Sequence, residues 1–424
     1  MIVPSIDLMN GQTVQLVGGK EHALDAGDPI PIAKRFAIAG EIAVVDLDAA
    51  LGRGTNTNLI RPLLKIAPCR VGGGIRDEQT AVNWLDAGAA KIVLGTAAKP
   101  ELLRNLPRER VVAALDADNG EVVVEGWKKR TGETILDRMR ALEGLVGGFL
   151  VTFVEREGRL SGTNLDLVPE LIKAAAGARV TIAGGVTTPE DIRALDDLGA
   201  DAQVGMALYT GRLELADAIT SVLRSDRSDG LWPTVVTDEL GTALGLVYSS
   251  KESVREALRT GRGVYQSRKR GLWTKGESSG DVQTLLRIDP DCDRDALRFT
   301  VRQSGRGFCH VGRENCWAPA TGLPLLASTL RERSAVSSPD SYTTRLLRSP
   351  DLLASKLLEE ARELAEAKEH PDVVHEAADV FFFAMTAMTR GGVSLAEVCA
   401  ELDRRALRVT RRAGNAKPAS ENRP

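Results

Sequence analysis

A glycine-rich segment occurs twice in the first half of this chain, and this repeat constrains the fold more than any other feature. Residues 71–89 begin Val-Gly-Gly-Gly-Ile, and residues 182–200 begin Ile-Ala-Gly-Gly-Val, at an offset of 111 residues. Asp7 follows an apolar run and Asp116 follows a similar run at an offset of 109, so one half of this region has been used twice. Each copy offers a carboxylate and a loop whose backbone N–H groups can approach a phosphate. The doubling suits a substrate with a phosphate at each end and acid–base chemistry in the middle.

The composition is that of an ordinary globular protein, and the length of 424 residues predicts about three domains. A net charge of −3 offers no basic surface for nucleic acid, and no apolar stretch reaches membrane-spanning length. The N-terminus lacks the pattern of a signal peptide, and five cysteines in so long a chain do not make a disulfide framework. We therefore expect a cytoplasmic protein that binds neither nucleic acid nor membranes.

The first 224 residues alternate short β-branched runs with helix-like segments. The runs lie near residues 2–6, 43–47, 68–71, 91–94, 111–115, 148–152, 179–183 and 202–205. Eight strands separated by helices predict a (β/α)8 TIM barrel, and the repeat then corresponds to two fused half-barrels. After a polar linker, residues 231–320 contain short strands and one helix, and residues 341–410 are nearly all helical in pattern. The chain is expected to be multidomain.

The chemistry of such barrels takes place at the carboxyl ends of the strands. Asp7 ends the first strand and Asp116 ends the fifth, so the two carboxylates face each other across the mouth, while Thr152 ends the sixth. Opposed carboxylates can act as base and acid if their surroundings separate their pKa values. The alternative is that each aspartate caps the turn or helix that follows it. The symmetric placement beside two glycine loops favours a functional role.

The first region resembles the isomerases that convert phosphoribosylformimino-aminoimidazole carboxamide ribotide from an aminoaldose to an aminoketose. The matching stretches are Val3-Pro4-Ser5-Ile6-Asp7-Leu8, Val45-Asp46-Leu47-Asp48, Gly72-Gly73-Gly74-Ile75-Arg76, Gly126-Trp127 and Gly205-Met206-Ala207-Leu208-Tyr209. The resemblance covers residues 1 to about 220 of a domain that we place at 1–224. It implies Asp7 as general base, Asp116 as general acid and Thr152 as their hydrogen-bonding helper. The phosphates are expected at Gly73, Gly74, Gly95, Gly184, Gly185, Gly205 and Met206.

The chain departs from the isomerase pattern at positions that bear on substrate binding. These positions are Gln15, Lys20, Phe153, Glu157 and Arg159. Members of the isomerase family usually carry Arg at position 15 and a Gln-Gly-Asp/Glu loop around position 20. Asp, Asp and Thr are common at positions 153, 157 and 159. Two alternatives follow, namely a barrel that serves only as a scaffold for a dimer, and a barrel that acts on a related bisphosphate as a cyclase-type or dual-specificity isomerase does.

Aspartates and cysteines are concentrated in the middle region. Three alternating aspartates lie between strand-like stretches, at Asp291, Asp293 and Asp295. On a strand their carboxylates would share one face and suit Mg²⁺, while Cys292 would point the other way. Three cysteines within 25 residues could bind Zn²⁺ with an open fourth position, and these are Cys292, Cys309 and Cys316. The alternatives are a structural zinc site, or a free buried cysteine beside a solvated acidic turn.

This middle region resembles phosphoribosyl-AMP cyclohydrolase over about residues 228–318. The matches run through Gly263-Val264-Tyr265, Ser267-Arg268, Leu272-Trp273, Lys275-Gly276-Glu277-Ser278-Ser279-Gly280, Gln283, the aspartate run and Cys309-His310-Val311-Gly312. The resemblance implies an α+β metal-binding domain with Zn²⁺ on the three cysteines, Cys292 coming from the other subunit of a dimer, and Mg²⁺ on the three aspartates. A zinc hydroxide would attack an adenine ring carbon, with His310 as a candidate proton shuttle.

Paired acids mark the helical region. The acids are Glu359, Glu360, Glu363, Glu376 and Asp379, and they include pairs at i,i+3 on one helix face. His370-Pro371-Asp372 separates the two groups and predicts a break between two helices that fold back on each other. Converging acids suit a Mg²⁺ site that binds a polyphosphate, whereas a solvated acidic stripe is the alternative. The packing faces are expected at Leu357, Leu358, Leu364, Val380, Phe381 and Phe382.

The E-x-x-E, spacer, E-x-x-D pattern resembles the all-α nucleotide pyrophosphohydrolases. Ser341-Tyr342-Thr343, Lys356 and Val409-Thr410-Arg411-Arg412 point to phosphoribosyl-ATP pyrophosphohydrolase over residues 338–417. The resemblance implies Mg²⁺ on the five acids, Glu360 and Glu363 as catalytic residues in the attack of water on the α-phosphoryl group, and Lys356 on the phosphates.

The three resemblances fall on consecutive steps of histidine biosynthesis. The main hypothesis is therefore a trifunctional enzyme that acts on small phosphoribosyl nucleotides, uses Zn²⁺ and Mg²⁺, and forms a homodimer. The alternative is a bifunctional cyclohydrolase and pyrophosphohydrolase whose barrel is a non-catalytic scaffold.

Overall fold

The computed structural model describes residues 1–18, 21–124, 127, 129–317, 319–335 and 341–410. Two compact units make up the chain. Unit 1 comprises Met1–Val236, Val247–Arg302 and the residues from Leu407 onward, and unit 2 comprises Thr237–Leu246 and Gln303–Ala406. The ends of the third expected domain, at 338–340 and 411–417, lie outside the described residues. None of the described helices combines the length and apolar character needed to cross a membrane.

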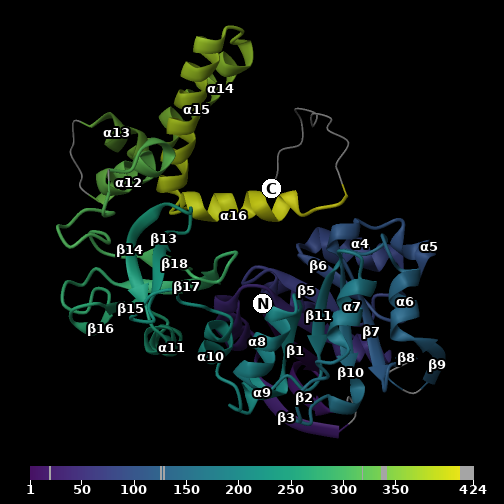
Figure 1. Ribbon diagram of the computed structural model, residues 1–424. Helices are drawn as coiled ribbons and strands as arrows, with labels where there is room; N and C mark the ends of the chain where they lie inside the picture. The colour runs from purple at the N-terminus through teal and green to yellow at the C-terminus, as the bar shows by residue number, and fades with distance from the viewer. Residues whose placement is uncertain (19–20, 125–126, 128, 318, 336–340, 411–424) are drawn as a thin grey trace. The chain divides into compact units, whose positions relative to one another are not determined.

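Eight parallel strands form a closed barrel in unit 1, as the sequence predicts (Figure 1). In chain order they are β1 (Ile2–Met9), β4 (Ile42–Asp46), β5 (Cys69–Gly72), β6 (Lys91–Leu94), β7 (Val111–Asp118), β10 (Gly148–Phe153), β11 (Arg179–Ala183) and β12 (Asp201–Val204). The barrel closes because β10 pairs with β7 on one side and with β11 on the other. Short apolar runs, such as Ile42 to Val44, are almost completely buried because helices cover the outer face of the strands.

The sequence repeat reappears as a structural repeat. After β1 the chain forms a hairpin of β2 (Gln12–Val17) and β3 (Glu21–Gly27), and after β7 it forms β8 (Glu121–Val124) and β9 (Lys129–Thr134). Asp7 pairs with Val14 in the first half, and Asp116 pairs with Val123 in the second, so both aspartates occupy the same register. The two copies therefore present their carboxylates in equivalent positions at the barrel mouth.

The helices around the barrel are short, and their caps repeat as well. They are α1 (Pro29–Phe36), α2 (Leu47–Leu51), α3 (Thr57–Leu63), α4 (Glu78–Ala87), α5 (Pro100–Leu103), α6 (Ile135–Ala141), α7 (Val168–Ala174), α8 (Pro189–Asp197), α9 (Met206–Tyr209) and α10 (Leu215–Ser221). Asp77 caps α4 by accepting the Thr80 N–H, and Thr188 caps α8 by accepting the Asp191 N–H. Each cap contributes about 1 kcal/mol and sets where the helix begins after its glycine loop.

A charged network fills the amino-terminal end of the barrel, opposite the mouth. Arg70 on β5 donates to Thr181 on β11 at 2.7 Å and to Glu41 at 2.7 Å. Asp201 at the start of β12 binds Arg179 and the N-terminal ammonium, which lie 2.7 and 2.8 Å away. Burial alone would raise its pKa, but these cations lower the pKa of Asp201 to about 2. This end of the barrel is therefore held together by satisfied ion pairs.

The middle region forms a four-stranded sheet in the order β14, β13, β18, β17. The strands are β13 (Trp232–Thr237), β14 (Ala243–Ser249), β17 (Gln283–Pro290) and β18 (Leu297–Gln303), and β15 (Val264–Ser267) and β16 (Gly271–Thr274) form a separate pair after helix α11 (Lys251–Thr260). Tyr265 is completely buried against Phe299, and its hydroxyl donates to Gln283 at 2.6 Å. A satisfied buried hydroxyl of this kind lets an aromatic side chain fill the core without a desolvation penalty.

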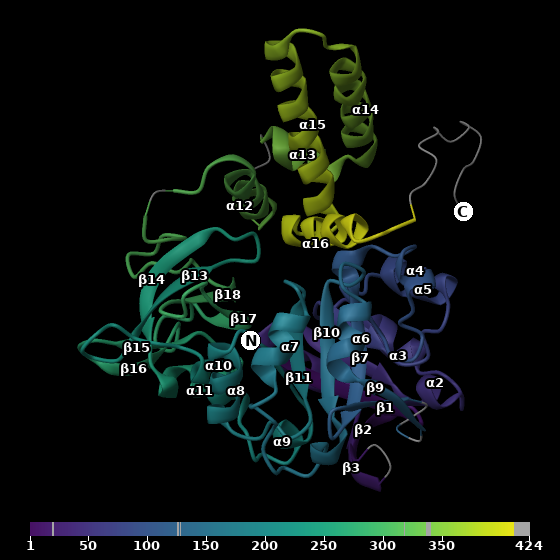
Figure 2. The same ribbon diagram turned by 45° about the vertical axis from the view of Figure 1, so that its right-hand side comes forward.

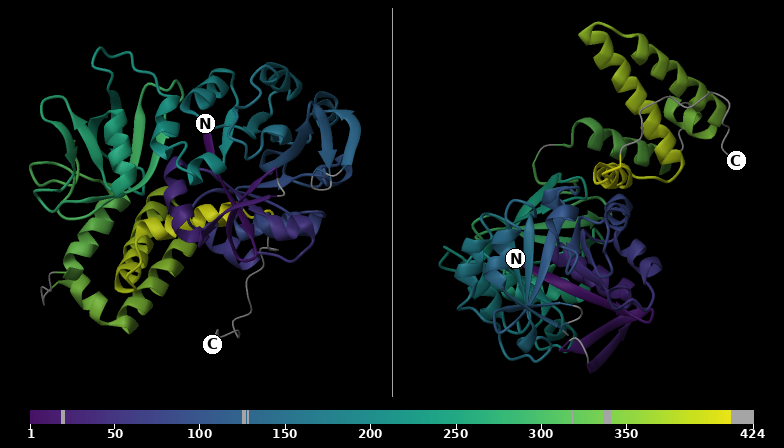
Figure 3. Two further views of the ribbon diagram at one scale, coloured as in Figure 1. Left: turned by 90° about the horizontal axis from the view of Figure 1, so that it is seen from below. Right: turned by 90° about the vertical axis from the view of Figure 1, so that its right-hand side faces the viewer.

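Unit 2 is mostly helical (Figure 2). Its helices are α12 (Gly322–Ala335), α13 (Tyr342–Arg348), α14 (Pro350–Glu366), α15 (His370–Arg390) and α16 (Leu395–Ala406). The predicted break is confirmed, because α14 ends at Glu366 and α15 begins with Pro371 in its first turn. Helices α14 and α15 lie side by side in every view (Figure 3). Leu353 of α14 and Phe383 of α15 form a core with Leu346 of α13. The expected packing role of Leu358 and Phe381 is wrong, because these side chains are 72% and 51% exposed.

Candidate functional site

The barrel mouth brings together the three residues that sequence reasoning placed there. Asp116 on β7 lies directly opposite Thr152 on β10 in the parallel register. The side chains of Thr152 and Trp127 both hydrogen-bond to the Asp116 carboxylate. At the equivalent position of the first half, Asp7 has Val45 as its neighbour on β4, which offers no hydroxyl. The two aspartates therefore share a register but differ in their surroundings.

Burial shifts both aspartates away from their ordinary acidity. It raises the pKa of Asp7 to about 7. It also raises the pKa of Asp116, against the opposing effect of the hydrogen bonds from Trp127 and Thr152. A carboxyl group that titrates near neutral pH can take up or release a proton at physiological pH, which an exposed aspartate cannot do efficiently. The mouth of the barrel is thus prepared for proton transfer.

Glu157 is a third carboxylate at the mouth, and the sequence indicated it only as a departure from the family pattern. Burial, together with the negative charges of Asp7 and Asp116, raises its pKa to about 7. The loop that carries Glu157 is fixed to the first hairpin, because the Gly18 N–H donates to the Glu157 carbonyl at 3.2 Å. Gly158 packs so closely on Leu16 that a side-chain carbon there would lie 2.7 Å from the Leu16 carbonyl oxygen. Such loop contacts leave no periodic signal in the sequence.

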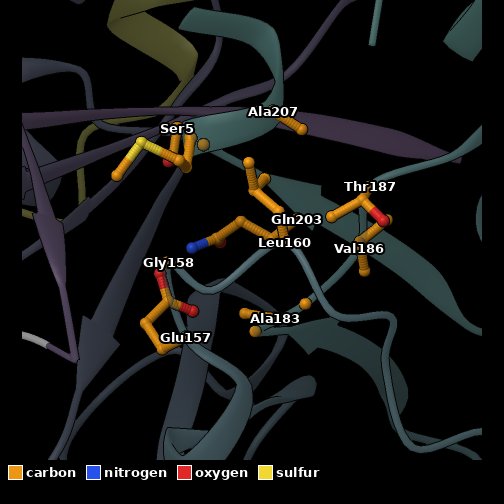
Figure 4. A pocket seen from close by; sticks show the side chains of 13 residues that line it. Ser5, Glu157, Gly158, Leu160, Ala183, Val186, Thr187, Gln203 and Ala207 are labelled. Atoms are coloured by element: carbon orange, nitrogen blue, oxygen red, sulfur yellow. The ribbon is translucent and has the colours of Figure 1, made fainter. Parts of the chain in front are cut away.

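A pocket opens beside Glu157 (Figure 4). It is lined by Ser5, Glu157, Gly158, Leu160, Ala183, Gly184, Gly185, Val186, Thr187, Gln203, Gly205, Met206 and Ala207. Four of the seven residues expected to bind phosphate are among them, and all four come from the second half of the repeat. Figure 4 shows the Glu157 carboxylate and the Gln203 side chain pointing into the same space. Sequence reasoning missed Ser5, Thr187 and Gln203. Strand alternation could have indicated Ser5 on β1 and Gln203 on β12, whereas Thr187 lies in the loop between β11 and α8.

The glycine loops are required by the backbone itself. A side-chain carbon on Gly73 would lie 2.1 Å from the Asp46 carbonyl oxygen, and one on Gly184 would lie 2.6 Å from that of Phe153. Both residues adopt positive φ, as do Gly74 and Gly185. The equivalent crowding in both halves explains why the repeat kept these glycines. Gly95, by contrast, has open space where its side chain would be.

The departures from the isomerase pattern fall into different environments. Gln15 is buried, and its side-chain oxygen would lie 2.8 Å from a side-chain carbon on Gly205, so it borders the pocket. Phe153 is buried and faces away from solvent, whereas Arg159 is exposed. Lys20 lies outside the described residues. Gln15 and Glu157 are therefore the departures that border the candidate site.

The three aspartates of the middle region converge, but the strand that was expected to align them is absent. Residues 291–296 form the turn between β17 and β18. Arg294 adopts a φ of 70° in this turn, and the N–H groups of Asp295 and Ala296 donate to Asp291 at 3.0 and 3.1 Å. Carboxylate oxygens of Asp291, Asp293 and Asp295 all lie within 4.8 Å of one another. The charge of Asp293 raises the pKa of Asp295, which is the electrostatic strain that a bound cation would relieve.

The three cysteines expected to bind zinc are divided between the units. Cys292 is exposed in unit 1, whereas buried Cys309 and exposed Cys316 belong to unit 2. A hydrogen bond from the Val311 N–H, with others from Arg313 and Cys316, lowers the pKa of the Cys309 thiol. His310 is exposed beside it. All five cysteines are free, so none is consumed by a disulfide.

A second carboxylate cluster lies between α14 and α15. Oxygens of Glu360, Glu363 and Glu376 all lie within 4.8 Å of one another. One oxygen of Glu376 is buried and has no hydrogen-bond partner among the described residues. Desolvation raises the pKa of Glu376, and the charge of Glu363 adds to this effect. A buried, unpartnered carboxylate oxygen among other acids is a fitting ligand for a hard divalent cation.

The remaining helical residues are paired with one another. Lys356 lies 2.9 Å from Glu359 and 3.4 Å from Glu360, and these contacts raise its pKa. Asp379 lies 3.5 Å from the His375 ring. The metal-binding roles of Glu359 and Asp379 and the phosphate-binding role of Lys356 therefore stay predictions.

Comparisons with known proteins agree with this geometry. A model of the histidine biosynthesis protein family matches residues 1–214. The chain belongs to this family. Models of phosphoribosyl-AMP cyclohydrolase and phosphoribosyl-ATP pyrophosphohydrolase match residues 245–318 and 323–406. The order of the three matches along the chain is the order that the motifs indicated.

Curated relatives of this histidine-biosynthesis chain are themselves fused or single enzymes. A histidine biosynthesis trifunctional protein of Neurospora crassa is 39% identical over 79% of this chain and 37% of its own length. A histidine biosynthesis bifunctional protein of Schizosaccharomyces pombe is 53% identical over 49% of this chain and 50% of its own length. An imidazole-4-carboxamide isomerase of Methanocaldococcus jannaschii is 36% identical over 52% of this chain and 99% of its own length. The chain thus spans half or less of the two fungal relatives and nearly all of the archaeal one.

Proposed function

We propose that this chain is a trifunctional enzyme of histidine biosynthesis. Its helical region hydrolyses phosphoribosyl-ATP to phosphoribosyl-AMP and pyrophosphate, its middle region opens the adenine ring, and its barrel isomerises the resulting aminoaldose to the aminoketose. The observation that carries this proposal is the match of three enzyme families to one chain, such that each region produces the substrate of the next. The substrates are small phosphoribosyl nucleotides.

In the barrel, Asp7 removes a proton from the sugar carbon next to the amine-bearing carbon, and Asp116 supplies a proton to the sugar ring oxygen as the ring opens. Asp7 must be ionised for this role, whereas Asp116 must be protonated. Burial raises the pKa of Asp116 and so favours its protonated form, and the hydroxyl of Thr152 orients that carboxyl group. The backbone of Gly184, Gly185 and Gly205 binds one substrate phosphate in the pocket.

A purely structural barrel is the second reading, and the buried acids argue against it. Burial raises the pKa of three carboxyl groups, Asp7, Asp116 and Glu157, at one mouth. Each such shift costs stability at neutral pH, because the ionised form is disfavoured in the fold. A purely structural barrel gains nothing from this loss of stability, whereas proton transfer near neutral pH needs the raised pKa values that cause it. A barrel acting on a related bisphosphate would use the same residues.

The middle region would hold Zn²⁺ through Cys292, Cys309 and Cys316, and Mg²⁺ through Asp291, Asp293 and Asp295. When bound, Zn²⁺ would supply an acidified water for attack on the adenine ring. The Val311 N–H lowers the pKa of the Cys309 thiol, which favours the thiolate that such binding needs. Zinc analysis of the Cys309→Ser and Cys316→Ser variants tests this assignment, and full retention of zinc in both would contradict it.

The helical region would hold Mg²⁺ through Glu360, Glu363 and Glu376, with Glu359 and Asp379 close by. When bound, Mg²⁺ would neutralise the polyphosphate charge during attack of water on the α-phosphoryl group. Glu360 and Glu363 would serve as metal-binding catalytic residues, and Lys356, which pairs with Glu359 and Glu360, would contact the phosphates.

We further propose that the protein is a cytoplasmic homodimer. The resemblance to cyclohydrolases assigns Cys292 to the other subunit of a dimer. Val374 and Phe381, seven residues apart on one face of α15, are 57% and 51% exposed, and apolar side chains of this size mark interaction surfaces. Free cysteines are typical of a reducing compartment.

Complementation tests the isomerase step directly. The full chain is introduced into a host that lacks only this isomerase, beside the Asp7→Asn variant. We expect growth with the wild-type chain and no growth with Asp7→Asn at equal expression. Absence of growth from well-expressed wild-type protein would leave the barrel as a scaffold, and pyrophosphate release from phosphoribosyl-ATP, measured on the same protein, would show whether the helical site is active.

A further inference from the structure

One residue of the candidate metal-binding turn reaches out of its own region and binds the barrel. The Arg294 guanidinium contacts both carboxylate oxygens of Asp196 on α8, at 3.2 and 2.9 Å. The pair is mostly shielded from solvent, with side-chain exposures of 17% and 11%. A bidentate, shielded pair of this kind is stronger and more directional than an ordinary surface ion pair.

Arg294 also organises the turn from within. It stands between Asp293 and Asp295, and its positive φ is the conformation that reverses the chain there. Its Nη1 donates to the Asp291 carbonyl at 3.1 Å, and its own carbonyl accepts the Arg224 N–H at 2.8 Å. The residue is therefore tied at both its side chain and its backbone, while the three carboxylates beside it converge.

Asp196 is fixed on the barrel side. The N-terminal ammonium lies 3.2 Å from it, and a cleft lined by Asp196, Arg179, Asp293 and Cys292 joins this corner of the barrel to the turn. Burial alone would raise its pKa, but Arg294 and the N-terminal ammonium hold the pKa of Asp196 below its usual value. Asp196 therefore stays ionised and can hold the guanidinium at neutral pH.

We infer that the Asp196–Arg294 ion pair is a positioning device through which the amino-terminal end of the barrel sets the geometry of the Asp291, Asp293 and Asp295 metal site. This inference rests on the proposed metal site of the middle region. It gives the barrel a second role, independent of its own mouth, because the pair lies at the opposite end of the strands from Asp7. Partners that orient metal ligands typically change metal affinity by 10- to 100-fold when removed.

Another ion pair provides a matched control. Arg255 on α11 binds Glu214 and Asp217 beside or on α10 at 2.9 and 2.8 Å, so it also joins the middle region to the barrel. It lies on a helix rather than on the metal-binding turn. Removing it weakens the same interface without touching the aspartates. A general loosening of the interface would therefore affect both pairs, whereas positioning of the turn would affect only Arg294.

The test measures Mn²⁺ binding to the full chain by electron paramagnetic resonance of free Mn²⁺. A Glu376→Gln background removes the helical cluster, so that the signal reports on the turn. We expect Arg294→Asn and Asp196→Asn each to weaken Mn²⁺ binding about 10-fold, the double variant to weaken it no further, and Arg255→Gln to stay within about 2-fold. Asparagine suits the positive φ of position 294, so that Arg294→Asn decides the test even if Asp196→Asn folds poorly.

Two results would overturn the inference. Unchanged Mn²⁺ binding in Arg294→Asn, or an equal loss in Arg255→Gln, would reduce the pair to an ordinary interface contact. Asp293→Asn separates this failure from failure of the proposed site. If Asp293→Asn abolishes Mn²⁺ binding while Arg294→Asn does not, the metal site stands and the positioning role falls. If Asp293→Asn also binds normally, both fall.

Discussion

The barrel mouth and the α14–α15 pair both gather carboxyl groups but place them in different surroundings. In the barrel, the acids come from β1, β7 and the loop after β10. They are Asp7, Asp116 and Glu157, and burial raises the pKa of each. Between the helices, oxygens of Glu360, Glu363 and Glu376 converge within 4.8 Å of one another, and desolvation raises the pKa of Glu376. The first group has the raised pKa values that proton exchange needs, and the second has the converging oxygens that a hard cation prefers.

The difference teaches that environment, rather than residue type, assigns the role. A carboxyl group held near pH 7 by burial has two accessible protonation states. Carboxylates that crowd together on two helices are costly until a cation neutralises them. The expected consequences are a pH-dependent barrel reaction and a metal-dependent helical reaction. Each prediction below tests one side of this contrast.

The largest effect is expected from the barrel aspartates. Asp7→Asn and Asp116→Asn should each reduce isomerase turnover by roughly 10²- to 10⁴-fold, the usual loss for one acid–base group. The measurement is kcat for aldose-to-ketose conversion by the full chain. Glu170→Gln, on the exposed surface of α7, is the control and should match the wild type. If kcat falls by less than threefold in both aspartate variants, Asp7 and Asp116 only cap the turns that follow them. The contrast between the barrel mouth and the helical cluster would then not hold.

The helical cluster should respond to metal where the barrel does not. Glu376→Gln and Glu363→Gln should reduce pyrophosphate release by roughly 10²-fold or more at limiting Mg²⁺, because a ligand of the cation is lost. Isomerase activity of the same proteins should not change. Pyrophosphate release is measured across a Mg²⁺ titration. If pyrophosphate release by both variants depends on Mg²⁺ as it does in the wild type, the helical acids form a solvated stripe and do not bind the metal.

A smaller effect is expected at Thr152. Replacing it with Val removes the hydroxyl that hydrogen-bonds to Asp116 and keeps the shape of the side chain. Asp116 becomes a carboxylate as it gives up its proton, and loss of one hydrogen bond to this developing charge corresponds to about 1.5 kcal/mol, or roughly 10-fold in kcat/KM. The Asp116→Asn/Thr152→Val double variant should be no slower than Asp116→Asn alone. An additive loss would show that Thr152 acts independently of Asp116.

Replacing Glu157 should shift the pH profile of the isomerase reaction rather than abolish the reaction. Isomerase kcat/KM should rise with pH through about 7, because Asp7 must lose its proton to act as a base and its pKa is about 7. The charges of Glu157 and Asp7 repel each other, so that Glu157→Gln should lower the pKa of Asp7 and move this limb to lower pH by less than about one unit. If the rise of kcat/KM with pH is unchanged in Glu157→Gln, Glu157 does not affect the pKa of Asp7.

The smallest effect is on stability. The pKa of Asp7 is about 7 in the fold and 3.8 in a model peptide, so the folded state binds more protons between these values and the free energy of unfolding falls as pH rises. Asp7→Asn should therefore melt at a higher temperature than the wild type at pH 8, and the difference should shrink toward pH 4. Mg²⁺ should stabilise the wild type more than Glu376→Gln, which keeps only the proposed site at Asp291, Asp293 and Asp295. Thermal unfolding at two pH values, with and without Mg²⁺, measures both.

Several parts of the fold follow from patterns that are local in sequence. The eight strands and the internal repeat are predictable because alternating apolar runs and doubled glycine loops are properties of short segments. The same repeat places Asp7 and Asp116 at equivalent strand ends, where Val14 and Val123 confirm their register. The break at Pro371 follows from the missing N–H of proline. Such patterns lie within short segments, so they can be read without knowing which other segments pack against them.

Tertiary structure alone decided which side chains meet. Glu157 joins the barrel acids because its loop is bonded to Gly18, which lies 139 positions earlier in the chain. The aspartates near Arg294 converge through a turn with positive φ, where periodicity predicted a strand. Phe381 is exposed although its neighbours Phe382 and Phe383 pack into the core. Each outcome depends on contacts between distant segments, and such contacts are selected by packing and hydrogen bonding across the fold, which no short stretch of sequence contains.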